Sequence, residues 1–231
     1  GDLALYGTIM DSWHRPIEEY GVRGEDGGRG GRYLIVPPGY TGHIPVAGYQ
    51  VFHQDSYLGY TLMRPLVSDK SPESLAAATE LVKQVHVYPL AEAENPPESR
   101  HIDLTGLEVD GIVKWDETLY RNLHEILDME FIEDKDLAMM GMLKAMGIAR
   151  GLPYETDARR DEILKDAAQR AHEYMLVLYH GEDMIPPFYE GKKWGSILPP
   201  DFGSHKFAFQ YPGYLDWNRR GSTYYAIFSS I

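Results

Sequence analysis

The side chains best suited to binding a polar ligand gather in two short segments, one near each end of the chain. Each segment places carboxylate, imidazole or aromatic groups in an irregular stretch bounded by glycine or proline. Segments of that kind carry function more often than regular elements do. The competing interpretation is that the two tryptophans only close the ends of a core. The candidate ligand-binding residues here are Asp11, Trp13, His14, Tyr189, Glu190 and Trp194.

A basic pair near the C-terminus offers a different chemistry. Arg219 and Arg220 are adjacent in a chain whose formal net charge is −13. A guanidinium group binds a carboxylate through two parallel hydrogen bonds, so this pair is a further ligand-binding candidate. The alternative is that the pair neutralises acidic side chains nearby.

Two histidine–acid pairs have a spacing that a metal ion could use. His53 and Asp55 are two residues apart, as are His101 and Asp103, and on a strand such residues point to the same face. The spacing supplies no third ligand, which a zinc site needs. We therefore favour solvent-facing polar positions over a metal centre, and we predict no cofactor.

A glycine-rich segment spans residues 21–32 (GVRGEDGGRGGR). A phosphate-binding loop needs a strand before it and a helix N-terminus after it. Here the loop leads into the run YLIV at residues 33–36, which has the character of a strand and no helix cap. The segment therefore predicts a surface loop between two strands.

Motifs for nucleophilic catalysis are missing from the sequence. The chain has no Gly-x-Ser-x-Gly elbow, and with no cysteine it has no thiol nucleophile, thiolate metal site or disulfide. Acidic side chains are plentiful, and glycoside hydrolysis requires two carboxylates that face each other across a cleft. A hydrolase or lyase that uses paired carboxylates, with or without a metal, in a cleft lined by Tyr and Trp is therefore kept as an alternative.

The composition is that of a folded globular protein. The 231 residues, 43% of them hydrophobic, are enough to bury a core. The 17 tyrosines outnumber the 7 phenylalanines, and tyrosine suits half-buried positions and clefts for polar ligands. The negative charge repels phosphate backbones, so we do not expect nucleic acid as a partner. No apolar run approaches the length that spans a bilayer.

The elements that position these residues fall into a β-rich part and a helical part. From residue 30 to residue 66, short β-branched and aromatic runs alternate with glycine and proline turns, a pattern typical of an antiparallel sandwich or barrel. Ser71 followed by Pro72 marks a helix start. Further helices are predicted after Asp116, over residues 135–146 with Gly147 at the C-terminal end, and from Thr156 or Asp157 onward.

The spacing of apolar residues also predicts which helix faces are buried. In the helix over residues 135–146 the predicted inward residues are Leu137, Met140 and Leu143. In the last and longest helix the predicted apolar stripe is Ile163, Ala167, Ala171, Tyr174 and Leu178.

The fold class that we predict is α+β, an antiparallel β-sandwich or barrel-like sheet with an inserted or appended helical segment. The predicted division is a β-rich domain over residues 1–112, a helical segment over 113–185, and an aromatic loop with a C-terminal strand over 186–231 that returns to the sheet. A strand that ends at Ile231 leaves an unpaired edge. We therefore expect a homo-oligomer or pairing with a further domain.

Several motifs, in this order and spacing, resemble the bacterial domain-of-unknown-function family DUF1254. The resemblance implies an exported protein, periplasmic or secreted, with a β-rich domain followed by helices. It also implies a following C-terminal β-sandwich domain of the DUF1214 type, which we expect to be absent from this chain, and it assigns no catalytic residues. The motifs are GGRYLIVPPGY (30–40), YLGYTLMRPLV (57–67), VYPLAEAENPP (87–97), MGIARGLPY (146–154), PPFYEGKKW (186–194) and RRGSTYYAIFSS (219–230).

Two functional hypotheses follow from these observations. In the first, the chain is a binding or structural module that acts through oligomerisation or a small polar ligand. In the second, it is the carboxylate-based hydrolase or lyase described above. We favour the first, because no catalytic constellation stands out in the sequence.

Overall fold

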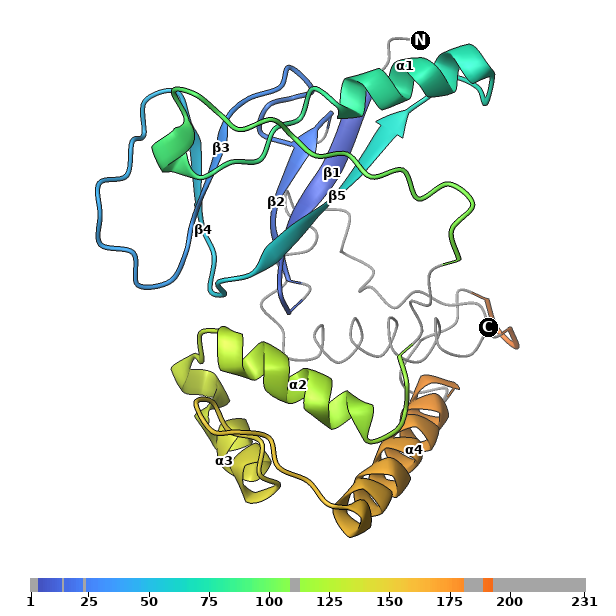
Figure 1. Ribbon diagram of the computed structural model, residues 1–231. Helices are drawn as coiled ribbons and strands as arrows, with labels where there is room; N and C mark the ends of the chain where they lie inside the picture. The colour runs from blue at the N-terminus through green and yellow to red at the C-terminus, as the bar shows by residue number, and fades with distance from the viewer. Residues whose placement is uncertain (1–3, 14, 23, 109–112, 181–188, 193–231) are drawn as a thin grey trace. The chain divides into compact units, whose positions relative to one another are not determined.

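The computed structural model describes residues 4–13, 15–22, 24–108, 113–180 and 189–192 (Figure 1). The chain divides into two compact units, residues 1–108 and residues 109–231, which are described separately below. Within the described residues, the first unit holds five strands and one α-helix, and the second holds three α-helices. The predicted α+β class is therefore confirmed.

Unit 1 is built on a three-stranded antiparallel sheet. The strand order is β2 (Pro16–Gly21), β1 (Ala4–Asp11) and β5 (Gly59–Leu66), so the first strand of the chain lies in the middle. β1 pairs with β5 in unbroken register from Ala4 opposite Leu66 to Asp11 opposite Gly59. The register between β1 and β2 shifts at Met10, next to the turn.

Asp11 holds the turn between β1 and β2. Its side chain is buried, and Oδ1 accepts hydrogen bonds from the backbone N–H groups of Trp13 (2.9 Å) and Arg15 (2.8 Å). Oδ2 accepts a further bond from Nε of Arg15 at 2.6 Å. A carboxylate that accepts local backbone N–H groups is a turn-forming device, which explains why an acidic residue is tolerated in the interior here.

The second sheet of unit 1 departs from the prediction. β3 (Tyr33–Val36) and β4 (Gln50–His53) form a two-stranded parallel pair. The prediction of antiparallel pairing was therefore wrong for these strands, because residues 37–49 are long enough to carry the chain back to the same end of the pair. Within the described residues, the two small sheets form no closed sandwich or barrel.

The glycine-rich segment is a loop between β2 and β3, as predicted. Asp26 lies buried inside it: Oδ1 accepts the N–H of Gly21 (2.7 Å) and Oδ2 accepts the N–H of Gly30 (2.9 Å). Gly27, Gly28 and Gly30 have φ values of +55°, +76° and +76°, which favour glycine. One carboxylate thus joins the end of one sheet to the start of the other.

Helix α1 (Pro72–Val82) begins as predicted and lies beside β5 (Figure 1). Oγ of Ser71 accepts the N–H of Ser74 at 3.2 Å, and Pro72 occupies the first turn, where no N–H is needed. Residues 83–89, which we call the strap, then run back to the short 3₁₀ helix η1 (Leu90–Glu92) without forming a strand. Residues 101–108 form irregular chain with a turn at Thr105 and Gly106.

Unit 2 contains α2 (Thr118–Met129), η2 (Asp134–Asp136), α3 (Leu137–Ala145) and α4 (Ala158–His180). The predicted helix ends are confirmed by their hydrogen bonds. Asp116 accepts the N–H of Thr118, and Asp157 accepts the N–H of Arg160. Gly147 has φ +75°, and the N–H of Ile148 donates to the carbonyl of Leu143, a helix-ending motif that buries Ile148.

The predicted buried faces were wrong in part. Leu143 is buried in α3, but Leu137 is 58% exposed. In α4 the buried residues are Leu164 and Ala168, while Ile163 is 56% exposed. Tyr174 in the predicted stripe is also exposed, and the side chain of Leu178 lies outside the described residues. The spacing of apolar residues correctly indicated helices but not which face of each helix is buried, because apolar residues lie on two adjacent faces.

No helix in the described part of the chain is both long and apolar enough to cross a lipid bilayer. The predicted C-terminal strand near Ile231 lies outside the described residues.

Replacing Gly7 with alanine should destabilise unit 1. A Cβ at this position would clash with the backbone oxygen of Leu62 and with the ring of Tyr20. We expect Gly7→Ala to lower the free energy of unfolding by about 1–3 kcal/mol, the usual cost of forcing extra volume into a packed site. Chemical denaturation followed by circular dichroism measures this. Gly31→Ala is the control, since its first contact would be the flexible Gln50 side chain, and it should stay within about 0.5 kcal/mol of wild type.

Neutralising the Asp26 carboxylate should also destabilise the fold. In Asp26→Asn one oxygen becomes an NH₂ group and faces a backbone N–H, so one donor loses its acceptor. The expected loss is about 1–3 kcal/mol in the same denaturation experiment. Glu94→Gln, at an exposed position of the same unit, is the matched control. Equal stability of the two variants would contradict the role given to Asp26.

Candidate functional site

A cavity of about 1050 Å³ lies within unit 1. Its walls come from the three-stranded sheet, the glycine-rich loop, β3 with the residues that flank it, and the strap. The size is at the upper end of what small-molecule sites occupy. Tyrosine is the most frequent side chain in its lining: Tyr20, Tyr33, Tyr40, Tyr49, Tyr60 and Tyr88.

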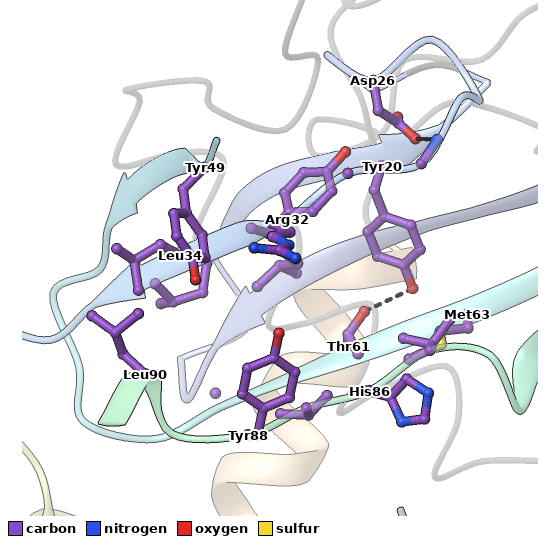
Figure 2. A pocket seen from close by; sticks show the side chains of 18 of the residues that line it. Tyr20, Asp26, Arg32, Leu34, Tyr49, Thr61, Met63, His86, Tyr88 and Leu90 are labelled. Carbon is purple, nitrogen blue, oxygen red and sulfur yellow. Dashed lines mark hydrogen bonds between the residues drawn. The ribbon is translucent and has the colours of Figure 1, made fainter. Parts of the chain in front are cut away.

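Tyr20 reaches from β2 across β1 to β5. The missing side chain of Gly7 leaves room for its ring, and its hydroxyl lies 2.9 Å from Oγ1 of Thr61 and donates to the carbonyl of Leu62 at 3.2 Å (Figure 2). Oγ1 of Thr61 also bonds to the carbonyl of Thr8 at 3.1 Å. Burial raises the pKa of Tyr20, and the hydrogen bond to Thr61 offsets only part of that effect. The ring is therefore a fixed, neutral part of the cavity wall.

Tyr33 connects the two sheets through ring contacts. Its ring meets Tyr20 edge to face with centroids 6.2 Å apart, and it stacks on Phe52 at 5.9 Å. Burial, and then the neighbouring Asp26 carboxylate, raise the pKa of Tyr33 far above its ordinary value. The phenol stays neutral throughout the physiological range. Aromatic contacts of this kind add to the stability gained from burial alone.

Arg32 brings a positive charge to the cavity. It directly precedes β3, and its guanidinium carbon lies 5.9 Å from the ring centroid of Tyr49, which precedes β4 (Figure 2). A cation held over an aromatic face gains electrostatic stabilisation while its N–H donors stay available at the edge of the group.

The strap closes the cavity on another side. His86, Tyr88 and, after the strap, Leu90 line it, and Figure 2 shows the ring of Tyr88 directed into the cavity. Nδ1 of His86 lies 2.9 Å from Oγ of Ser99, which ties the strap to the loop beyond η1. Tyr88 is half-buried, whereas its neighbours Val87 and Pro89 are exposed. The strap thus directs one aromatic ring inward from an otherwise exposed segment.

The cavity lining in the described part of unit 1 includes none of the candidate residues from the sequence. Asp11 and Trp13 belong to the β1–β2 turn and are not among the lining residues of the cavity. Tyr189 is 70% exposed and Glu190 is exposed, in a turn of unit 2 in which the N–H of Lys192 donates to the carbonyl of Tyr189. His14, Trp194, Arg219 and Arg220 lie outside the described residues. A ligand-binding role for these eight residues stays a prediction.

The histidine–acid pairs do not share a strand face. His53 ends β4 and Asp55 lies beyond it, where the Asp55 carboxylate is 3.8 Å from a guanidinium nitrogen of Arg15. His101 and Asp103 are exposed in irregular chain. Hydrogen bonding from the Thr105 side chain, and then from its backbone N–H, lowers the pKa of the Asp103 carboxyl group. In the described part of the chain, no group of three or more His, Asp or Glu side chains could hold a metal ion.

The cavity residues could not be found by motif. They come from segments between Ala4 and Pro96 and converge only in the folded unit. The one available signal was the excess of tyrosine over phenylalanine, which indicates half-buried rings with polar tips but not their positions.

Comparison with solved structures gives a similar fold in a larger protein. The crystal structure of the VPA0106 protein from Vibrio parahaemolyticus matches with a TM-score of 0.56 and 14% sequence identity. The match covers 96% of this chain and 50% of that chain, so the chain spans half the length of that protein. At this identity the likeness concerns the fold alone. No curated protein matches the chain.

Comparison with protein families bears on the resemblance noted in the sequence. Residues 3–89 match the family described as "Protein of unknown function (DUF1254)", and this segment contains β1–β5, α1 and the strap. Nearly all of the cavity lining falls inside it. Residues 3–89 of the chain are therefore similar to the DUF1254 family, whose function is unknown.

Proposed function

We propose that unit 1 is a small-molecule binding module whose ligand occupies the tyrosine-lined cavity. The observation that carries this proposal is the cavity itself, which has a ligand-sized volume of about 1050 Å³ and mixes apolar side chains with the polar tips of tyrosines. Small-molecule sites have this character: mostly apolar walls and a few placed polar groups.

The packing of unit 1 supports the proposal. Its fully buried apolar residues are few among those described: Met10, Ile17, Val36 and Ala78. Leu5, Ile9, Leu34, Met63 and Leu90 line the cavity, each half-buried. A ligand that covers these side chains would add about 25 cal/mol for each Å² of apolar surface removed from water.

The hydrolase or lyase alternative gains no support from the cavity. Asp26 is the single carboxylate in its described lining, and both of its oxygens already accept backbone N–H groups. Paired-carboxylate chemistry needs a second acid facing the first across the cleft.

The family resemblance supports two wider proposals about the whole protein. We propose that it is exported, to the periplasm or outside the cell. We also propose that it acts with a further domain of the DUF1214 type or as a homo-oligomer. The 50% coverage of the VPA0106 protein supports a further domain. Native mass spectrometry of the full-length protein distinguishes a monomer from an oligomer.

Filling the cavity should abolish binding of an apolar probe. N-phenylnaphthylamine is neutral and fluoresces strongly in apolar surroundings, so we expect one molecule to bind per chain. Leu34→Trp and Leu90→Trp place an indole in the cavity from β3 and from η1. Each should weaken binding at least about tenfold, a cost of about 1.4 kcal/mol. Fluorescence titration measures the affinity, and circular dichroism verifies that each variant folds.

The control variant adds the same bulk outside the cavity. Leu75 is 49% exposed on α1 and does not line the cavity, so Leu75→Trp should bind the probe as wild type does. If the probe does not bind, or if all three variants bind it equally, the proposed function is wrong.

Alkaline conditions should destabilise unit 1 through its buried tyrosines. In the unfolded chain Tyr20 and Tyr33 ionise near 10.0, whereas in the folded unit their pKa values are raised. Their contribution to stability is therefore fully present below pH 10.0 and is lost as the pH rises from there through the folded pKa. Denaturation midpoints measured at increasing pH should fall above that point. The fall should be shallower in Tyr20→Phe, and an equally steep fall in that variant would contradict this account.

A further inference from the structure

We propose that the cavity binds an amphipathic carboxylate, whose charged group pairs with Arg32 and whose apolar body fills the space beyond it. This inference names the ligand class for the proposed function and rests on it. No feature of the sequence indicated it, since the net charge of −13 favours neutral or cationic ligands.

The net charge of the described cavity lining is positive, whereas the net charge of the whole chain is negative. In the described lining, the charged side chains are Arg29, Arg32 and Asp26. The Asp26 carboxylate is buried and accepts the N–H groups of Gly21 and Gly30. With two arginines and one carboxylate, the described lining carries a net positive charge.

Arg32 is the better placed of the two arginines. Within the described residues it forms no ion pair, and its position over the Tyr49 ring holds the guanidinium group at the cavity (Figure 2). Arg29 instead directs its guanidinium toward Gly27 in the glycine-rich loop. The planar guanidinium group of arginine can form two parallel hydrogen bonds to a carboxylate while it lies beside this ring.

The rest of the ligand must be largely apolar. Leu34, two positions after Arg32, lines the cavity from β3, and Met63 and Leu90 line other walls. The hydroxyl of Tyr20 is already bonded to β5, so it offers little to a polar group here. A ligand with a charged end and an apolar or aromatic body matches this distribution.

The negative charge of the chain does not override the local contact. Exposed charges more than about 8 Å apart are largely screened at physiological ionic strength. A carboxylate in contact with Arg32 lies well within that distance. The distant charges therefore affect mainly the rate of association, and the contact determines the affinity.

Two probes of the same shape test the charge requirement. Naphthoate and naphthamide differ in their carboxylate and carboxamide groups, and each is titrated against bound N-phenylnaphthylamine on the full chain. In wild type we expect naphthoate to displace the dye at a concentration about tenfold lower than naphthamide does, as a charge-assisted pair should produce. Arg32→Gln should remove this preference and leave naphthamide unchanged. Arg32→Lys should keep part of it, since the charge stays and the two-pronged geometry is lost.

Arg100→Gln is the matched control, because Arg100 is exposed in the same unit and outside the cavity lining. It should retain the full preference for naphthoate. Three results would overturn the carboxylate proposal: equal displacement by the two probes in wild type, an undiminished preference in Arg32→Gln, or equal loss in Arg100→Gln. In each of these cases bound dye would still uphold the cavity as a binding site, whereas failure of the dye itself to bind would reject the proposed function.

Discussion

The Asp26 carboxylate is the constraint on which the rest of unit 1 depends. It accepts one N–H from the last residue of β2 and another from Gly30, close to the start of β3, so it fixes where the second sheet begins relative to the first. Arg32 and Leu34 follow directly and reach the cavity from that point. Both oxygens accept backbone N–H groups, which gives this acid a structural role. What looks in the sequence like a glycine-rich ligand loop is therefore a joint between two sheets.

Tyrosine serves both structure and binding in this unit. Tyr20 crosses β1 above Gly7 and bonds to β5, and Tyr33 continues the ring contacts to Phe52 of β4. These rings connect the two sheets along one line. The rings leave a space beside them, and apolar side chains of unit 1 line this space as a cavity rather than forming a closed core. Small-molecule sites are clefts of about this size with mostly apolar walls, which is the basis of the proposed binding function.

The sequence predicted local structure well wherever one short-range interaction decides it. The ends of α1, α3 and α4 follow from Ser71, Gly147 and Asp157, each of which acts within a few residues. The parallel pairing of β3 and β4 could not be predicted, because it depends on how residues 37–49 return the chain. The phase of α4 failed for a related reason: Ile163 and Leu164 are equally apolar, and only tertiary packing chose Leu164. The candidate site was the hardest feature to predict from the sequence, since its residues meet only after two sheets and the strap have come together.

The position of β1 has a consequence for the order in which unit 1 assembles. β1 is the central strand, yet its partner β5 comes after β2, β3 and β4 in the sequence. The β1–β2 hairpin is local and can form early, whereas pairing Ala4 with Leu66 must close a long loop of chain. Proteins dominated by such non-local contacts fold slowly. The pairing of β5 with β1 both completes the three-stranded sheet and brings Thr61 to Tyr20.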